Sequence, residues 1–223
     1  MKVLKRVLYL GAICLAAVTA FTACNKDKVA KNTEGGDGLG DWKIASITLT
    51  QPGVADPVLA INIEDAKATQ TSLENFVDAE FPAMAALIKP MLAGIGLILP
   101  AVGEVEFDFE DKGVLNIENL PNKTPDVKGT WSKDGNTVTT NVPSFPTDKL
   151  GHYGVFMGLL AGKDVKFTKE GNKMVNKRSG SNLLDLFGSM GGKMGGEAMA
   201  TALAGLKTKY ANAEVTLTLV KKN

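Results

Sequence analysis

The chain has 223 residues, with 25 Lys+Arg, 24 Asp+Glu and 1 His, and 44% of the residues are hydrophobic. The first 23 residues hold three of the cations and no acid, so the remaining 200 carry 22 Lys+Arg against 24 Asp+Glu, a formal charge of −2. Arg178 is the only arginine after residue 23. This balance argues against a nucleic-acid partner, because such proteins usually show a patch rich in Lys and Arg. About 200 residues can build one generous domain or two small ones.

Residues 1–23 have the pattern of an export signal. A basic head, "MKVLKR", precedes an uncharged apolar run from Val7 to Ala23. This order, with small residues before a cut site, is typical of signal peptides. A permanent transmembrane helix usually needs about 20 apolar residues, so the run is marginal for a span.

The end of this run, "FTAC" from Phe21 to Cys24, resembles the lipobox of bacterial lipoproteins. Phe21 departs from the aliphatic residue that is usual there. The resemblance implies a lipoprotein signal peptide at residues 1–23, acylation of Cys24 and an envelope location at the outer membrane, on either of its faces. Acyl chains would then anchor the protein durably in the membrane. The alternative is an ordinary signal peptide that a cysteine happens to follow.

The second cysteine, Cys14, lies in the apolar run and would leave with the peptide. The mature chain would keep Cys24 alone, which excludes an internal disulfide and a thiolate metal site. Residues 24–40 are polar and glycine-rich, so we expect a flexible tether between the anchor and the body of the protein.

The body begins with a predicted strand and a helical region. Trp42 and Ile44 share one phase, while Ile47 and Leu49 take the other, which predicts a strand with a bulge near Ser46. The sequence "TSLE", residues 71–74, matches a capping box and predicts that a helix starts there. We expect prolines 82 and 90 to kink or break the helix. Residues 81–102 could alternatively span a membrane, but their prolines and glycines favour helices packed on a sheet.

Strict alternation starts at residue 104. In "EVEFDFED", the residues Val105, Phe107 and Phe109 share one face and the carboxylates take the other. Hairpins are predicted with turns at 111–113, at Asp134-Gly135 and at Glu170-Gly171. A helix is expected from residue 183 to about 207, and a last strand follows with its apolar face at residues 215, 217 and 219.

The fold class predicted from this order is mainly β with helices, as one antiparallel β-barrel. The last strand would pair with the first and remove the exposed edges. The opening "LGDWKI", with Gly40 and Trp42, and the hairpins "VEFDFEDKGVLNIEN" and "GTWSKDGNTVTT" are similar to the lipocalin-like (calycin-like) lipoproteins of Bacteroidetes. The resemblance implies a lipocalin-like domain over residues 41–223, with a helical insert after strand 1 and a helix before the last strand. That group has no assigned activity, and the long insert departs from a plain lipocalin barrel.

Residues that carry catalysis are scarce. His152 is the only histidine, and the sequence offers no G-x-S-x-G nucleophile motif or further zinc ligands for it. The "GSMGGKMGG" stretch falls one residue short of a phosphate-binding loop. The carboxylates at 104, 106, 108 and 110 are expected to form a solvated strand face, with calcium binding as the weaker alternative. We therefore expect no enzyme, no cofactor and no metal site.

Two functional hypotheses remain. In the first, the protein binds a small apolar ligand or a protein partner, and Trp42, Phe107, Phe109 and Trp131 line the site or fill the core. In the second, it is a structural or accessory envelope lipoprotein with a filled barrel and no small-molecule ligand. The size of the interior decides between them, because small barrels are often filled by their own side chains.

Overall fold

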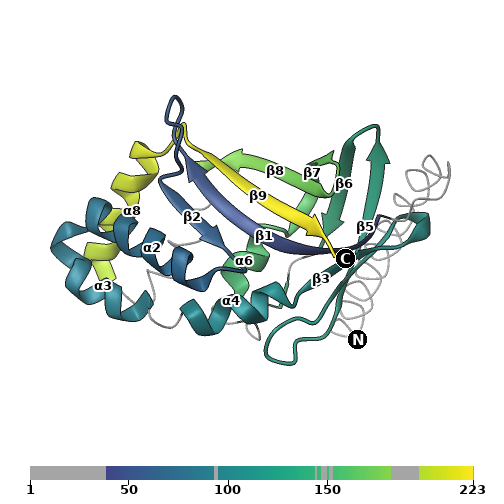
Figure 1. Ribbon diagram of the computed structural model, residues 1–223, viewed down its shortest axis with the longest axis horizontal. Helices are drawn as coiled ribbons and strands as arrows, with labels where there is room; N and C mark the ends of the chain where they lie inside the picture. Colours follow the sequence, from purple (N-terminus) through teal and green to yellow (C-terminus); the bar gives the residue numbers. More distant parts are fainter. Residues whose placement is uncertain are drawn as a thin grey trace, which may run out of the picture. The chain divides into compact units, whose positions relative to one another are not determined.

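The computed structural model describes residues 39–92, 95–143, 145–146, 150, 153–181 and 196–222 (Figure 1). The strands are β1 (Gly40–Thr50), β2 (Leu59–Asn62), β3 (Glu106–Phe109), β4 (Val114–Glu118), β5 (Val127–Asp134), β6 (Thr137–Val142), β7 (Gly162–Glu170), β8 (Lys173–Ser179) and β9 (Glu214–Lys221). The helices are α2 (Ala66–Glu80), η2 (Pro82–Met84), α3 (Ala85–Leu92), α4 (Ile95–Gly103), η3 (Asp111–Gly113), α6 (Gly154–Gly158) and α8 (Gly196–Lys209).

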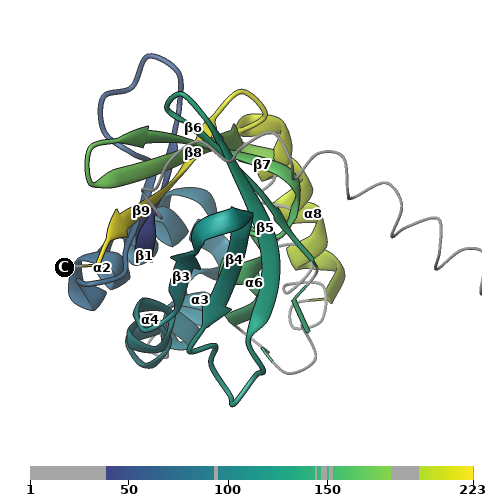
Figure 2. The same cartoon turned by 90° about the vertical axis from the view of Figure 1, so that its right-hand side faces the viewer.

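The strands form a closed antiparallel barrel, which confirms the predicted fold class. They follow the order β2-β1-β3-β4-β5-β6-β7-β8-β9, and β9 returns to pair with β1. Eight strands thus close on themselves, as the view in Figure 2 shows. Strand β2 stands beside the ring, next to β1 (Figure 1). The architecture is compatible with a lipocalin-like fold.

Strand β1 is the centre of this closure because both of its edges are paired. One edge follows β9 from Trp42 to Thr50, and the other pairs first with β3 and then with β2. The register with β9 shifts between Ile44 and Ser46, which confirms the predicted bulge. The bulge lets the apolar residues on both sides of it, in opposite sequence phases, point inward.

Two hairpins turn where the sequence predicts. Asp134 pairs with Thr137, and Glu170 pairs with Lys173, so each loop has two residues. The first loop residue is a glycine with positive φ in both, 57° at Gly135 and 61° at Gly171. A positive φ at this position suits two-residue hairpin loops and costs glycine no steric clash.

The helical insert follows β2, a short strand that the sequence analysis did not predict. Helix α2 begins at Ala66, because the Asp65 side chain accepts a hydrogen bond from the Ala68 N–H at 2.8 Å. The predicted start at the "TSLE" capping box is therefore wrong, and Thr71 lies inside the helix. Pro82 does end the helix, as expected, whereas α3 continues through Pro90.

Helix α2, which precedes β3 in the chain, and helix α8, which precedes β9, contact each other at one end of the barrel. Helix α2 ends at Glu80, whose carboxylate accepts hydrogen bonds from the Tyr210 hydroxyl at 2.6 Å and from Lys209 Nζ at 2.7 Å. Figure 1 shows α2, α3 and α8 gathered there. The expected helix before the last strand is thus present as α8, while its predicted first residues lie outside the described part of the chain.

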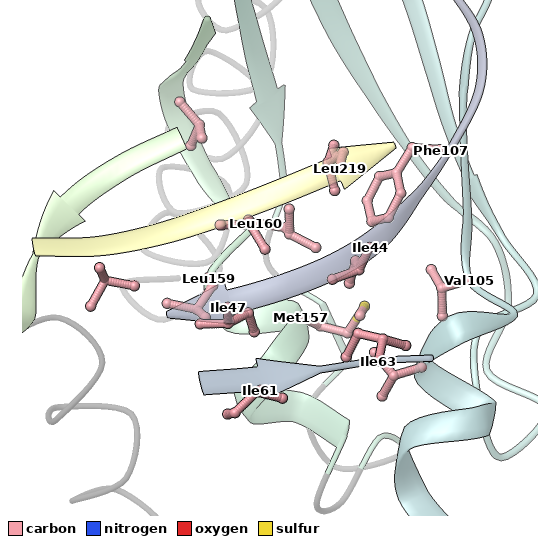
Figure 3. Close-up of a cluster of buried hydrophobic side chains, with 14 of the residues drawn as sticks. Ile44, Ile47, Ile61, Ile63, Val105, Phe107, Met157, Leu159, Leu160 and Leu219 are labelled. Atoms are coloured by element: carbon pink, nitrogen blue, oxygen red, sulfur yellow. The ribbon is translucent and has the colours of Figure 1, made fainter. Parts of the chain in front are cut away.

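The barrel interior is packed with side chains from all of its strands and from α6. Figure 3 shows Met157, Leu159 and Leu160 among the isoleucines of β1 and β2. Buried inward residues of the eight barrel strands include Trp42, Ile44, Ile47, Leu49, Phe107, Phe109, Leu115, Ile117, Val127, Val138, Val165, Phe167, Met174, Val215, Leu217 and Leu219. These buried side chains belong to one hydrophobic cluster.

Within the described residues, none of the helices combines the length and the apolar character that crossing a membrane requires. The predicted signal peptide, the lipidation site Cys24 and most of the tether lie outside the described part of the chain, as do His152 and the glycine-rich stretch.

Candidate functional site

The two ends of the barrel differ in construction. The hairpin end is formed by the start of β1, the β3–β4, β5–β6 and β7–β8 turns, and the end of β9. The helical end carries α2, α3, α4, α6 and α8 in its connections. Short turns leave the hairpin end open to solvent, so it is the natural place for an incoming group.

The four aromatic candidates occupy two environments. Trp42, Phe107 and Phe109 are almost fully buried, at 0, 2 and 1% exposure, whereas Trp131 is only half-buried. Trp42 and Phe107 stand opposite each other on β1 and β3, and the Trp42 indole N–H donates to the Leu39 carbonyl at 2.8 Å. Phe109 belongs to the same core, so Trp131 alone of these four aromatic residues is partly exposed.

Phe109 and Trp131 form an edge-to-face pair at the hairpin end. Their ring centroids are 5.7 Å apart with an interplanar angle of 76°. The Trp131 indole N–H donates to the Glu110 carbonyl at 2.9 Å, which fixes the orientation of the ring. This bond ties the β5 aromatic to the turn that follows β3.

A hollow of about 530 Å³ lies at the end of β3, where Phe109 is one of its lining residues and Trp131 is not. It is lined by Gly40, Asp108, Phe109, Glu110, Asp111 and Lys112, where β1 begins and β3 ends. We call this hollow, together with the Phe109–Trp131 pair, the rim site. Three carboxylates and one ammonium group give the hollow a negative balance.

The acids of the rim site repel one another. Burial, followed by the carboxylates of Asp41 and Glu110, raises the pKa of Asp108 above its ordinary value. Asp41 stands directly opposite Asp108 on β1. The predicted carboxylate row is exposed at Glu104 and Glu110 and half-buried at Glu106 and Asp108. Asn116 Nδ2 donates to Glu110 Oε1 at 2.5 Å. The described residues contain no group of three acids, histidines or cysteines placed to hold a metal ion.

A second hollow, of about 430 Å³, lies at the helical end. It is lined by Asn141, Val142, Pro143, Ala161, Gly162 and Lys163, where β6 ends and β7 begins. None of the four aromatic candidates lines it. Both hollows are outside the packed core, so neither is the interior cavity that a ligand-filled barrel would contain.

Two inward-facing polar residues were not expected from the sequence. On β8, Asn176 and Arg178 follow Met174 at intervals of two and stand opposite buried residues of β9. The period of two in "KMVNKRS" was the available signal, but polar residues at these positions hide it from a search for apolar alternation.

The chain matches no known family model, no curated protein and no solved structure.

Proposed function

We propose that the protein is a lipid-anchored envelope lipoprotein of the outer membrane that acts by binding, without catalysis, through its rim site. The ligand would be a small apolar molecule or an apolar side chain of a protein partner. The anchor part of this proposal rests on the "FTAC" sequence at Cys24. The binding part rests on the barrel and on the Phe109–Trp131 pair, of which Phe109 lines the open hollow.

The half-buried Trp131 is the observation that carries the proposal. Tryptophan has a large apolar surface and one N–H donor, and binding surfaces are enriched in it. Here the N–H is already bonded to Glu110, so the exposed part of the indole offers apolar contact. Because Trp42 and Phe107 fill the core, a ligand would meet the rim and leave the interior unchanged.

Intrinsic fluorescence tests this reading with two tryptophans in different environments. We expect the emission of the wild type to shift when a panel of envelope lipids and bile-like amphiphiles is titrated. The Trp131→Phe variant should lose the shift, because its remaining indole, Trp42, is buried in the core. A shift that persists in Trp131→Phe would exclude the rim site as the place of binding.

The packed interior favours a second function, that of an accessory envelope lipoprotein without a small-molecule ligand. Trp42 and Phe107 are buried in the core, and the two hollows lie at the ends of the barrel. No emission shift with any amphiphile of the panel would favour this alternative over the first.

The anchor is tested separately by mass spectrometry of the mature N-terminus. We expect Cys24 to be the first residue and to carry acyl chains, and Cys24→Ala should leave the precursor uncleaved at this site. An unmodified Cys24 would refute the anchor and leave the binding proposal standing.

A further inference from the structure

A second polar feature lies inside the barrel wall, at Arg178. In antiparallel pairs, residues directly opposite each other point to the same side of the sheet. Arg178 stands opposite Val215, and Asn176 stands opposite Leu217, and both β9 residues are buried in the core. The Arg178 side chain therefore leaves the backbone on the inner face of the barrel.

The sheet is incomplete at this point. Strands β7 and β8 pair only at Thr168–Glu170 with Lys173–Val175, although both strands continue beyond these residues. Beyond the last backbone pair, the Asn176 side chain connects the two strands, because its Nδ2 donates to the Lys166 carbonyl at 2.6 Å. Asn176 is 5% exposed, so this is a buried side-chain link between two strands that have stopped pairing.

The same amide orients Arg178. The Oδ1 atom of Asn176 accepts a hydrogen bond from Arg178 Nε at 2.8 Å. Both ends of the Asn176 amide are thus occupied, and the guanidinium is held through its inner nitrogen. The two terminal nitrogens of an arginine form a planar fork that fits a carboxylate or a phosphate with two parallel hydrogen bonds. A buried residue such as Asn176 that fixes the orientation of the arginine is the arrangement expected of a preorganised binding site.

The charge of Arg178 has no acidic partner in the described part of the chain. Glu214, on the neighbouring strand, belongs to the outer face and pairs there with Lys177 Nζ at 2.9 Å. Burial lowers the pKa of Arg178, because the half-buried guanidinium is less hydrated than it would be in water. A half-buried charge without a partner is unfavourable, so an oxyanion at this position would stabilise the fold.

We infer that Arg178, held by Asn176 in the gap between β7 and β8, is an anion-binding group that takes a carboxylate or phosphate oxyanion. The anion could be a free ion or the head group of an amphiphile, and the chemistry at Arg178 is the same for both. This site is separate from the rim site and does not depend on the proposed function.

Side-chain NMR of the full chain, labelled with ¹⁵N-arginine, tests the inference directly. The uncleaved chain has two arginines, Arg178 and Arg6 of the predicted signal peptide, so the Nε spectrum of this precursor should contain two signals. Titration with inorganic phosphate, hexanoate and hexyl phosphate should move the Arg178 signal to saturation and leave the Arg6 signal in place. Saturation with all three probes indicates a free anion, and saturation only with the alkyl probes indicates a head group. No movement, equal movement of both signals, or the same movement with hexanol overturns the inference.

Two variants separate binding from a structural role. Arg178→Gln should weaken the binding of the responding probe at least tenfold in calorimetry. Lys173→Gln removes the same charge from an exposed position of the same strand and should bind as the wild type does. A loss of stability in Arg178→Gln with unchanged affinity, or equal weakening in both variants, would show that Arg178 only braces the wall. If Arg178→Gln does not fold, the NMR titration of the wild type decides.

Discussion

Removing one hydroxyl group should loosen the contact between the first and the last helix of the domain. Tyr210 is 1% exposed, and its hydroxyl donates to Glu80 Oε1 at 2.6 Å. The Glu80 side chain is 6% exposed and also accepts from Lys209 Nζ. Burial and the neighbouring Glu80 both raise the pKa of Tyr210, so the phenol stays protonated and keeps donating across the whole range in which the protein is handled. Tyr210→Phe keeps the ring and deletes only this donor.

The size of the effect follows from the charge on the acceptor. A hydrogen bond to a charged group contributes about 1.5–3 kcal/mol to stability, roughly twice a neutral one. The ring of residue 210 still packs on Phe76, at 6.1 Å between centroids, so no cavity adds to the loss. We expect Tyr210→Phe to lower the free energy of unfolding by about 2 kcal/mol, and Tm by about 4–8 °C for a domain of this size.

Thermal and urea unfolding followed by circular dichroism would measure this loss. Tyr153→Phe is the matched control, because Tyr153 is half-buried and its hydroxyl makes no hydrogen bond to any residue that the structure describes. In Glu80→Gln, the further loss on adding Tyr210→Phe should be smaller, since the acceptor is no longer charged. If Tyr210→Phe were as mild as Tyr153→Phe, the buried carboxylate would not join the two helices and the reasoning would fail.

Three further changes test the barrel. Phe107→Asp should prevent cooperative folding, because it buries an unpaired carboxylate beside Trp42, and a normal melting curve would contradict the packed core. Asp108→Asn should raise stability at neutral pH: the raised pKa means that the native state favours the protonated acid, so stability falls as the pH rises through it. The gain should vanish as the pH falls toward 3.8, the ordinary pKa of an aspartate, and a gain that does not change with pH would exclude the proton as its cause. Gly180→Ala should lower Tm, because its Cβ would meet the Tyr210 carbonyl oxygen at 2.6 Å, whereas Gly205→Ala has free space and should raise Tm slightly.

The strands could be predicted from the sequence where one face carries only apolar residues and the other only polar or charged residues. In β3, apolar and acidic residues alternate without exception, and Phe107 and Phe109 are buried as expected. The hairpins were predictable because glycine marks their turns. Closure by the last strand followed from its alternation and from the need to cover an edge.

Other elements were hidden because polar residues occupy buried positions. Helix α2 buries Thr69, whose hydroxyl donates to the Asn62 carbonyl and accepts from the Asn62 N–H. Apolar periodicity therefore starts only at Leu73, one turn later, which explains the misplaced helix start. Asn176 and Arg178 hide the inner face of β8 in the same way. The rim hollow could not be predicted, since its walls come from β1 and from the turn after β3, far apart in sequence.

The pairing of β1 along its whole length with β9 has a consequence for how the chain reaches its native state. Every hydrogen bond between these strands, from Trp42 with Lys221 to Thr50 with Glu214, joins the first strand of the domain to the last. Such distant pairs form slowly, because a long loop must close before they gain any stability. During folding, one edge of β1 therefore stays unpaired until β9 has formed. Loss of even the last few residues would leave that edge free to recruit a strand from another molecule.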